Sequence, residues 1–220
     1  MTDVTQLGGG YAESRPDPEP TVKAVLNAAR AGSAHAHLAI LCGPPGVGKS
    51  AAAAQLAEFV PHSFCVDKDT TAAGFILQAA RDRGEPTSAA YGTDHYWAAL
   101  RPLEYAGPTA LACANLVGTR RVFLIGGWGP ELSVAHLWTD LQQKIAPARL
   151  SIFHLDAPPL ETWRARMAAR GSRSDSPWFD DFAAAVTGLP VWEGAVRIPT
   201  NQPLRAVTQA ILDALAQISS

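Results

Sequence analysis

The chain has 220 residues, of which 47% are hydrophobic and 17% are charged, and its formal net charge is −2. These values argue against a basic nucleic-acid-binding surface, and the length suits one globular domain with a small-molecule partner. The sequence also has neither a leader pattern at its start nor a run of about twenty apolar residues, so we expect a cytoplasmic protein that binds no membrane.

Residues 1–20 are expected to form a flexible N-terminal arm, because glycines and prolines gather there. The remainder, 21–220, is expected to be a single domain. A helix at 21–30 precedes short apolar runs that alternate with helical patterns, which is typical of a parallel sheet with crossover helices. The predicted strands are 37–42, 63–66, 121–125, 150–155 and 195–199. The predicted helices are 49–59, 72–83, 131–145, 160–169, 180–186 and 204–218.

An insertion at 84–118 separates the second and third predicted strands. Its helical pattern is interrupted at Gly107-Pro108, so we expect two helices there. Its aromatic residues either cover a substrate or pack in the core, which is the commoner role of aromatic residues on helices. Arg81, Arg83 and Arg101 are alternatives for holding a substrate carboxylate, and Arg101 enters the predicted substrate site.

The octapeptide Gly43-Pro44-Pro45-Gly46-Val47-Gly48-Lys49-Ser50 matches the phosphate-binding pattern GxxxxGK[ST]. An apolar strand precedes it, and the alanine-rich helix predicted at 49–59, which contains Ala51, follows it. The glycines let backbone N–H groups turn toward phosphates, and a helix N-terminus favours anions. Lys49 is expected to reach the β- and γ-phosphates, and the Ser50 hydroxyl to ligate Mg²⁺. We predict that residues 43–51 bind ATP or GTP.

Two carboxylates, Asp67 and Asp69, follow the second predicted strand, where ligands of open α/β sheets bind. One of them is placed to support Mg²⁺ and the other to accept the proton of an attacking hydroxyl. The alternative is that Asp69 or Thr70 simply caps the next helix. The third predicted strand lacks the carboxylate that hydrolytic P-loop motors carry, and no Asn-Lys-x-Asp motif supports a GTPase. Both absences favour a kinase.

On these residues the chain resembles the small-molecule kinases of the P-loop superfamily, the group that includes shikimate kinase, gluconate kinase and chloramphenicol phosphotransferase. The resemblance covers residues 38–215. It implies a three-layer α/β P-loop NTPase fold, with a five-stranded parallel sheet flanked by helices and a helical lid. It further implies that Asp67 supports the metal, that Asp69 is the base that binds substrate, and that Gly126 and Gly127 contact substrate. For the two glycines the alternative is a tight turn, and Trp128 either lines the pocket or packs.

The resemblance also places a lid at 161–178, which contains the densest arginine cluster of the chain. Arg166 and Arg170 are four residues apart, so they share a helix face and are expected to bind ATP phosphates. Arg170 and Arg173 are expected to stabilise the transferring phosphoryl group. An ordinary solvated helix face is the alternative. Residues 199–203 are expected either to contact adenine or, through Thr200 and Asn201, to cap the last helix.

The sequence therefore predicts a kinase that uses ATP and Mg²⁺ to phosphorylate a hydroxyl of a small molecule. A nucleotide-binding regulatory or toxin-like NTPase without a small-molecule acceptor is one alternative. A nucleoside or nucleotide kinase is another.

Overall fold

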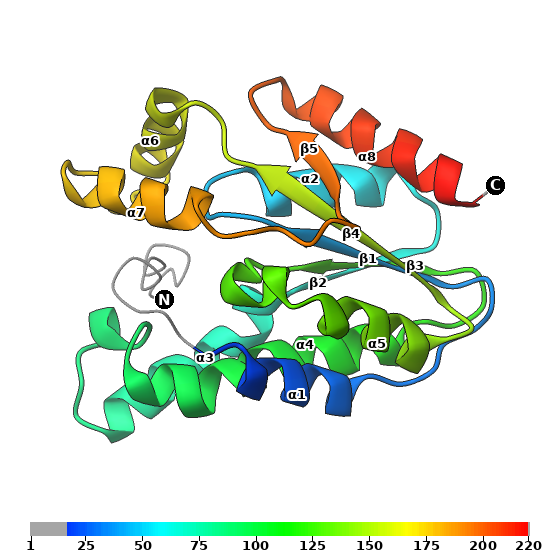
Figure 1. Cartoon of the computed structure of the whole chain (residues 1–220), viewed down its shortest axis with the longest axis horizontal. Coiled ribbons are helices and arrows are strands. Elements are labelled where there is room, and N and C mark those ends of the chain that lie inside the picture. The colour runs from blue at the N-terminus through cyan, green and yellow to red at the C-terminus, as the bar shows by residue number, and fades with distance from the viewer. Residues whose placement is uncertain (1–16, 220) are drawn as a thin grey trace.

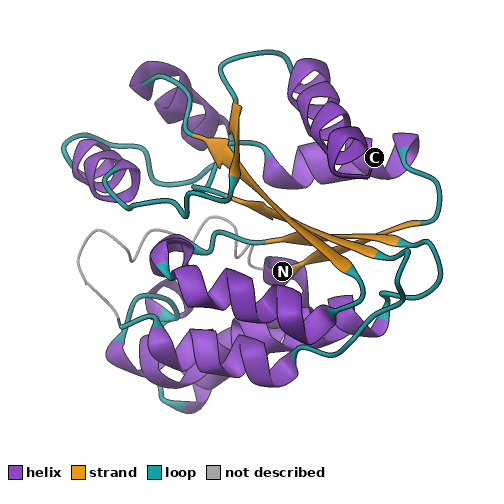
Figure 2. Ribbon diagram, turned by 45° about the vertical axis from the view of Figure 1, so that its right-hand side comes forward, coloured by secondary structure: helices purple, strands orange, loops and turns teal. Residues whose placement is uncertain are grey.

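The computed structural model describes residues 17–219 and places one sheet between two helical layers (Figures 1 and 2). All strand pairings in the sheet are parallel, and the order across it is β2-β3-β1-β4-β5. The strands are β1 (His37–Cys42), β2 (Ser63–Asp67), β3 (Arg121–Ile125), β4 (Arg149–Asp156) and β5 (Val196–Pro199). The three-layer α/β architecture predicted from the sequence is confirmed.

The helices form the two layers that cover the faces of the sheet, and some of them project beyond the carboxyl ends of the strands. They are α1 (Glu19–Ala28), α2 (Lys49–Phe59), α3 (Lys68–Asp82), α4 (Arg101–Ala114), α5 (Ala135–Ile145), α6 (Leu160–Ala169), α7 (Trp178–Thr187) and α8 (Leu204–Ser219). Two short 3₁₀ segments, η2 (Thr87–Ala89) and η4 (Gly129–Ser133), and one π-helical segment, η3 (Tyr96–Leu100), complete the described chain. None of the described helices has the length and apolar character needed to cross a bilayer.

The core has two main parts, one on each face of the sheet. Alternate residues of β1 point to opposite faces, as in any strand: Leu38 and Ile40 pack under α1, α4 and α5, while Ala39 and Leu41 pack under α2 and α8. Because both faces are covered, β1 is buried along its whole length. This is why the central strands read as continuous apolar runs in the sequence.

Helix α4 corrects the expectation of a break at Gly107-Pro108, because it runs through Pro108 without ending. A proline removes one helical N–H, and burial of the apolar face of α4 against α1 and α3 offsets that loss. The change of helix type falls instead at Leu100, where the π-helical segment ends and Pro102 stands in the first turn of α4. Proline is favoured in a first turn because its missing N–H has no helical partner there.

Two other boundaries differ from the sequence expectation. Helix α3 begins at Lys68 rather than at residue 72, because the Asp67 carboxylate caps its N-terminus. The predicted helix at 131–145 divides into η4 and α5, with Val134 between them. Most of the predicted N-terminal arm lies outside the described residues, and α1 begins at Glu19, inside the range assigned to that arm.

Candidate active site

A cavity of about 350 Å³ lies at the carboxyl ends of β1, β2 and β3. It brings together four groups of predicted site residues: the phosphate loop from Pro45 to Ala51, the two carboxylates after β2, the Gly126-Gly127 pair after β3, and two arginines from the lid segment. The sheet order explains this meeting, because β3 lies between β1 and β2 and the carboxyl ends of parallel strands share one edge.

The phosphate loop depends on glycine at positions where a side chain cannot stand. Gly43 has φ of +125°, and a Cβ there would lie 2.3 Å from the Leu155 carbonyl oxygen. Gly48 has φ of +99° and directly precedes α2. No side chain caps α2, so the N–H groups of its first turn are available to an anion. The loop therefore has the backbone geometry of a phosphate cradle.

Lys49 lies folded over this loop. Its Nζ donates hydrogen bonds to the carbonyl oxygens of Gly43, at 2.9 Å, and Pro44, at 2.7 Å. Burial lowers the pKa of the Lys49 ammonium to about 8, even though the nearby Asp69 carboxylate acts in the opposite direction. A phosphate in the loop would supply the negative charge that this buried cation lacks. Lys49 is thus placed as the sequence predicted, beside the cradle.

Ser50 and Asp67 form the candidate metal site. The Ser50 hydroxyl donates to Asp67 Oδ2 at 2.8 Å. Hydroxyl and carboxylate oxygens are the ligand types that Mg²⁺ prefers, and these two oxygens are close enough for one ion to be held by both residues, directly or through water. Asp67 aligns with Ile125 of β3, the strand whose end lacks a carboxylate. Ser50 and Asp67 would therefore hold Mg²⁺, which would neutralise phosphate charge.

Asp67 has a second role at the start of α3. Its Oδ1 accepts a hydrogen bond from the Asp69 N–H at 2.9 Å, which caps the helix. The sequence left open whether Asp69 or Thr70 was the cap, and the structure gives that role to Asp67. One carboxylate therefore anchors the helix with one oxygen and meets Ser50 with the other.

Asp69 stands beside three cations. Its side chain is 35% exposed, and its Oδ1 is 2.6 Å from Lys68 Nζ. Burial by itself would raise the pKa of the Asp69 carboxyl, but Lys68, Lys49 and Arg170 together lower it below its ordinary value. The carboxylate is therefore ionised at neutral pH and able to accept a proton, as a general base must be.

The lid segment contributes two of its three predicted arginines to the cavity, Arg166 and Arg170. Arg166 also donates to the Thr200 carbonyl oxygen at 2.8 Å, which ties α6 to the loop after β5. The Thr200 hydroxyl donates to the Asp156 carbonyl oxygen rather than capping α8. Arg173 does not line the cavity; it is half exposed, pairs with Asp175 at 2.9 Å and lies over the Trp178 ring. Its position does not support the predicted catalytic role.

Arg101 also differs from its prediction. Its side chain is 1% exposed and forms a two-pronged ion pair with Glu131, through hydrogen bonds of 2.9 and 2.7 Å. It lies outside the cavity lining and stacks on the rings of Trp97 and Tyr105. A guanidinium held in this way is a structural group, so a contact with a substrate carboxylate is not supported.

The aromatic residues near Arg101 take the packing role. Tyr96, Tyr105 and Trp128 are almost fully buried. The backbone N–H of Trp128 donates to the Tyr105 hydroxyl at 3.0 Å, and the two rings meet edge to face. Gly126 and Gly127 lie in the cavity wall. A Cβ on Gly126 would lie 3.0 Å from Trp128 Nε1, so the absence of a side chain there makes room for the packed aromatic rings.

Four important residues escaped the sequence reasoning. Lys68, Glu104 and Glu131 form buried ion pairs with partners distant in sequence, and no local pattern marks such residues. Trp163 donates from Nε1 to the Pro45 carbonyl oxygen at 2.8 Å, which joins α6 to the phosphate loop. Its place on the lid helix, one turn before Arg166, was the one signal available.

Comparisons with known proteins support the fold and leave the sequence family open. No protein-family model and no curated protein matches the sequence. The structure is similar to a gluconokinase from Sinorhizobium meliloti 1021, with a TM-score of 0.55 and 17% identity over 84% of this chain and 94% of that one. It is also similar to a tunicamycin resistance protein from Deinococcus radiodurans, with a TM-score of 0.55 and 18% identity over 82% of this chain and 95% of that one. For a shikimate kinase from Bacteroides thetaiotaomicron the TM-score is 0.54, with 16% identity over 82% of this chain and 98% of that one.

These likenesses confirm the predicted resemblance at the level of fold. The described chain shares its fold with these three proteins, of which one is named a gluconokinase and one a shikimate kinase. Their identities are too low to carry the role of any residue across.

Proposed function

We propose that this protein is a kinase that transfers the γ-phosphoryl group of ATP to a hydroxyl of a small molecule. The observation that carries the proposal is the placement of Asp69. An ionised, partly exposed carboxylate shares one cavity with the phosphate loop, Lys49 and Ser50. A phosphate cradle alone serves switches and motors equally well, whereas a carboxylate set beside it can deprotonate an acceptor.

The reaction we propose is an in-line phosphoryl transfer. The acceptor hydroxyl gives its proton to Asp69 while its oxygen bonds to the γ-phosphorus, and the bond from that phosphorus to the β,γ-bridging oxygen breaks to release ADP. Lys49, Arg166 and Arg170 line the cavity and would stabilise the charge that develops on the phosphoryl oxygens. Bound Mg²⁺, held by Ser50 and Asp67, would neutralise phosphate charge.

The lid contacts support a site that excludes water. Helix α6 reaches the phosphate loop through Trp163 and reaches the loop after β5 through Arg166. A Cβ on Gly46 would lie 2.7 Å from the sulfur of Met167, so this helix is closely packed over the loop. Exclusion of water from the γ-phosphate favours transfer to an acceptor over hydrolysis.

The proposal is tested by screening hydroxylated metabolites and antibiotics for acceptor-dependent ADP release in the presence of MgATP. Asp69→Asn should remove acceptor phosphorylation and leave the ATP dissociation constant within about twofold of wild type, because Asp69 acts on the acceptor. Asp82→Asn, at the exposed far end of the same helix, is the matched control and should be active. Full acceptor phosphorylation by Asp69→Asn would contradict the proposed base. ADP release that no acceptor stimulates would favour the NTPase alternative.

A further inference from the structure

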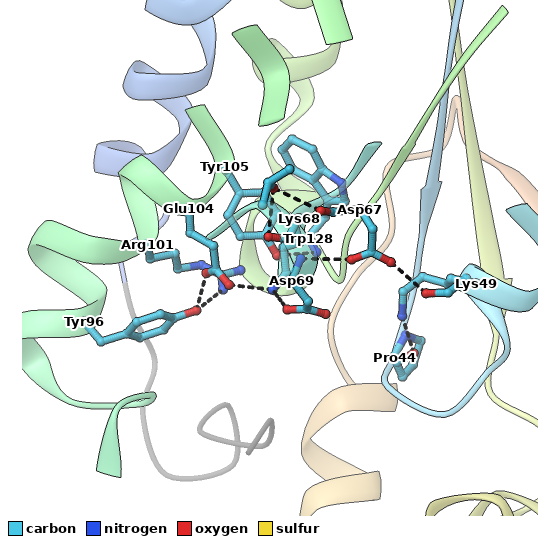
Figure 3. A network of polar contacts seen from close by, with 12 residues as sticks. Pro44, Lys49, Asp67, Lys68, Asp69, Tyr96, Arg101, Glu104, Tyr105 and Trp128 are labelled. Atoms are coloured by element: carbon cyan, nitrogen blue, oxygen red, sulfur yellow. Dashed lines mark hydrogen bonds and ion pairs between the residues drawn. The ribbon is translucent and has the colours of Figure 1, made fainter. Parts of the chain in front are cut away.

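Lys68 stands between the two candidate site carboxylates in sequence and bonds to one of them. Only 9% of its side chain is exposed. Its Nζ lies 2.6 Å from Asp69 Oδ1 and 2.6 Å from Glu104 Oε1, and 5.5 Å from the centre of the Tyr105 ring (Figure 3). One ammonium thus joins the partly exposed Asp69 at the cavity to a carboxylate of α4 inside the protein.

Glu104 is held as firmly as Lys68. Its side chain has no exposed surface, and its second oxygen accepts a hydrogen bond from the Tyr96 hydroxyl at 2.6 Å. Tyr96 in turn accepts a hydrogen bond from Arg101 (Figure 3). Glu131 fixes the Arg101 guanidinium. A buried charge with several fixed partners has little freedom to move. The Lys68 ammonium is therefore fixed by α4 and η4, and is not a mobile surface cation.

This cluster contains two cations, Lys68 and Arg101, and three carboxylates. Glu131 is matched by Arg101, whereas Glu104 and Asp69 share Lys68. Of the three carboxylates, Asp69 alone reaches the cavity. Its Oδ1 bonds to Lys68, and within residues 17–219 no hydrogen bond occupies its Oδ2. The cluster thus fixes one oxygen of Asp69 and leaves the other for a ligand.

We propose that Lys68 is a positioning residue, which Glu104 holds in place and which orients the Asp69 carboxylate so that Oδ2 receives the proton of the acceptor hydroxyl. This inference rests on the function proposed above and assigns Lys68 no contact with substrate. It makes the segment containing η3 and α4 part of the support of the base, although Tyr96, Arg101 and Glu104 lie outside the cavity lining.

The kinetic test compares Glu104→Gln, Lys68→Arg and the double variant Lys68→Met/Glu104→Gln, which removes both buried charges together so that neither is left unpaired. We expect the double variant to lose about 100-fold in kcat for acceptor phosphorylation, with KM for ATP within about twofold, because a misplaced base slows chemistry and leaves nucleotide binding intact. Glu104→Gln and Lys68→Arg keep a cation beside Asp69 and should stay within about tenfold of the wild-type kcat. Wild-type kcat in the double variant would overturn the assignment.

A crystal structure of the double variant tests the same inference without any acceptor. We expect the Asp69 side chain to leave its present rotamer once Lys68 is gone; an unchanged Asp69 would overturn the proposal. This structural readout tests the role of Lys68 separately from the proposed kinase function. If wild-type protein phosphorylates no acceptor, the proposed function fails, and the orientation of Asp69 still decides the role of Lys68.

Discussion

The proposed nucleotide side and the proposed acceptor side of this protein are built in opposite ways. The phosphate loop is one contiguous segment whose backbone N–H groups are available to an anion, and its lysine and serine follow directly in the chain. The proposed acceptor side is a cluster of charged side chains from three separate elements, α3, α4 and η4, joined by the Tyr96 hydroxyl of η3. The first arrangement is specified locally, while the second exists only when the whole domain has folded. Substitutions in the phosphate loop should therefore lower activity with little effect on stability, whereas substitutions of the buried ion pairs behind Asp69 should lower stability as well.

The largest effect on stability is expected from Arg101→Met. Loss of the guanidinium leaves Glu131 charged and buried without its partner, which should lower the free energy of unfolding by about 4 kcal/mol. Arg101→Met/Glu131→Gln removes both charges and should recover most of that loss. Urea denaturation of both variants measures the difference. If the single substitution costs less than about 1 kcal/mol, the cluster does not have the structural importance described here.

Lys49→Ala should show the reverse pattern. We expect kcat to fall by about 10³-fold, equivalent to about 4 kcal/mol of transition-state stabilisation, because a fixed cation beside the phosphates is lost. The free energy of unfolding should change by less than about 1 kcal/mol, since burial already disfavours the charged form of this lysine and lowers its pKa. Steady-state kinetics and urea denaturation of the same preparation check both parts. A large loss of stability in Lys49→Ala would remove the contrast between the two sides.

The start of β1 lies outside both regions and serves as a reference for the pH dependence of stability. His37 is 4% exposed and bonds to Ser151 at 2.7 Å, and burial, with the charges of Arg121 and Arg149, lowers its pKa from 6.5 to about 4. Between these pH values the unfolded chain binds a proton that the folded chain does not. Stability present above pH 6.5 is therefore lost as the pH falls, by about 3 kcal/mol at pH 4.

This loss is measured by urea denaturation at several pH values. His37→Gln can still bond to Ser151 but does not titrate, so its stability should fall less between pH 6.5 and 4. Equal pH dependence in both proteins would show that other groups control acid stability.

The smallest effect is expected from Arg173→Ala. Within residues 17–219, Arg173 contacts the exposed Asp175 and the Trp178 ring, so its replacement should change kcat less than threefold and have little effect on stability. Arg170→Ala is the matched variant from the cavity wall and should reduce kcat about 100-fold. Comparable losses of kcat in the two variants would support the catalytic role that the sequence predicted for Arg173.

The contrast between the two sides also explains what the sequence could predict. Residues 43–50 and the strand before them were predicted because motif and hydrophobic pattern lie side by side in the chain. The role of Glu104 was not predicted, since its partner Lys68 is 36 residues away and a carboxylate on an apolar helix face carries no local signal. Arg101 was assigned to substrate for the same reason: its partner Glu131 is 30 residues away. The path of α4 through Pro108 likewise depends on packing against α1 and α3.

Phosphorus NMR of the wild-type protein with MgATP and an acceptor found by the screen tests the central claim most directly. We expect a phosphomonoester signal to grow at the same rate as that of ADP, and neither signal to form with Asp69→Asn. Inorganic phosphate growing in place of the ester, with or without acceptor, would contradict it.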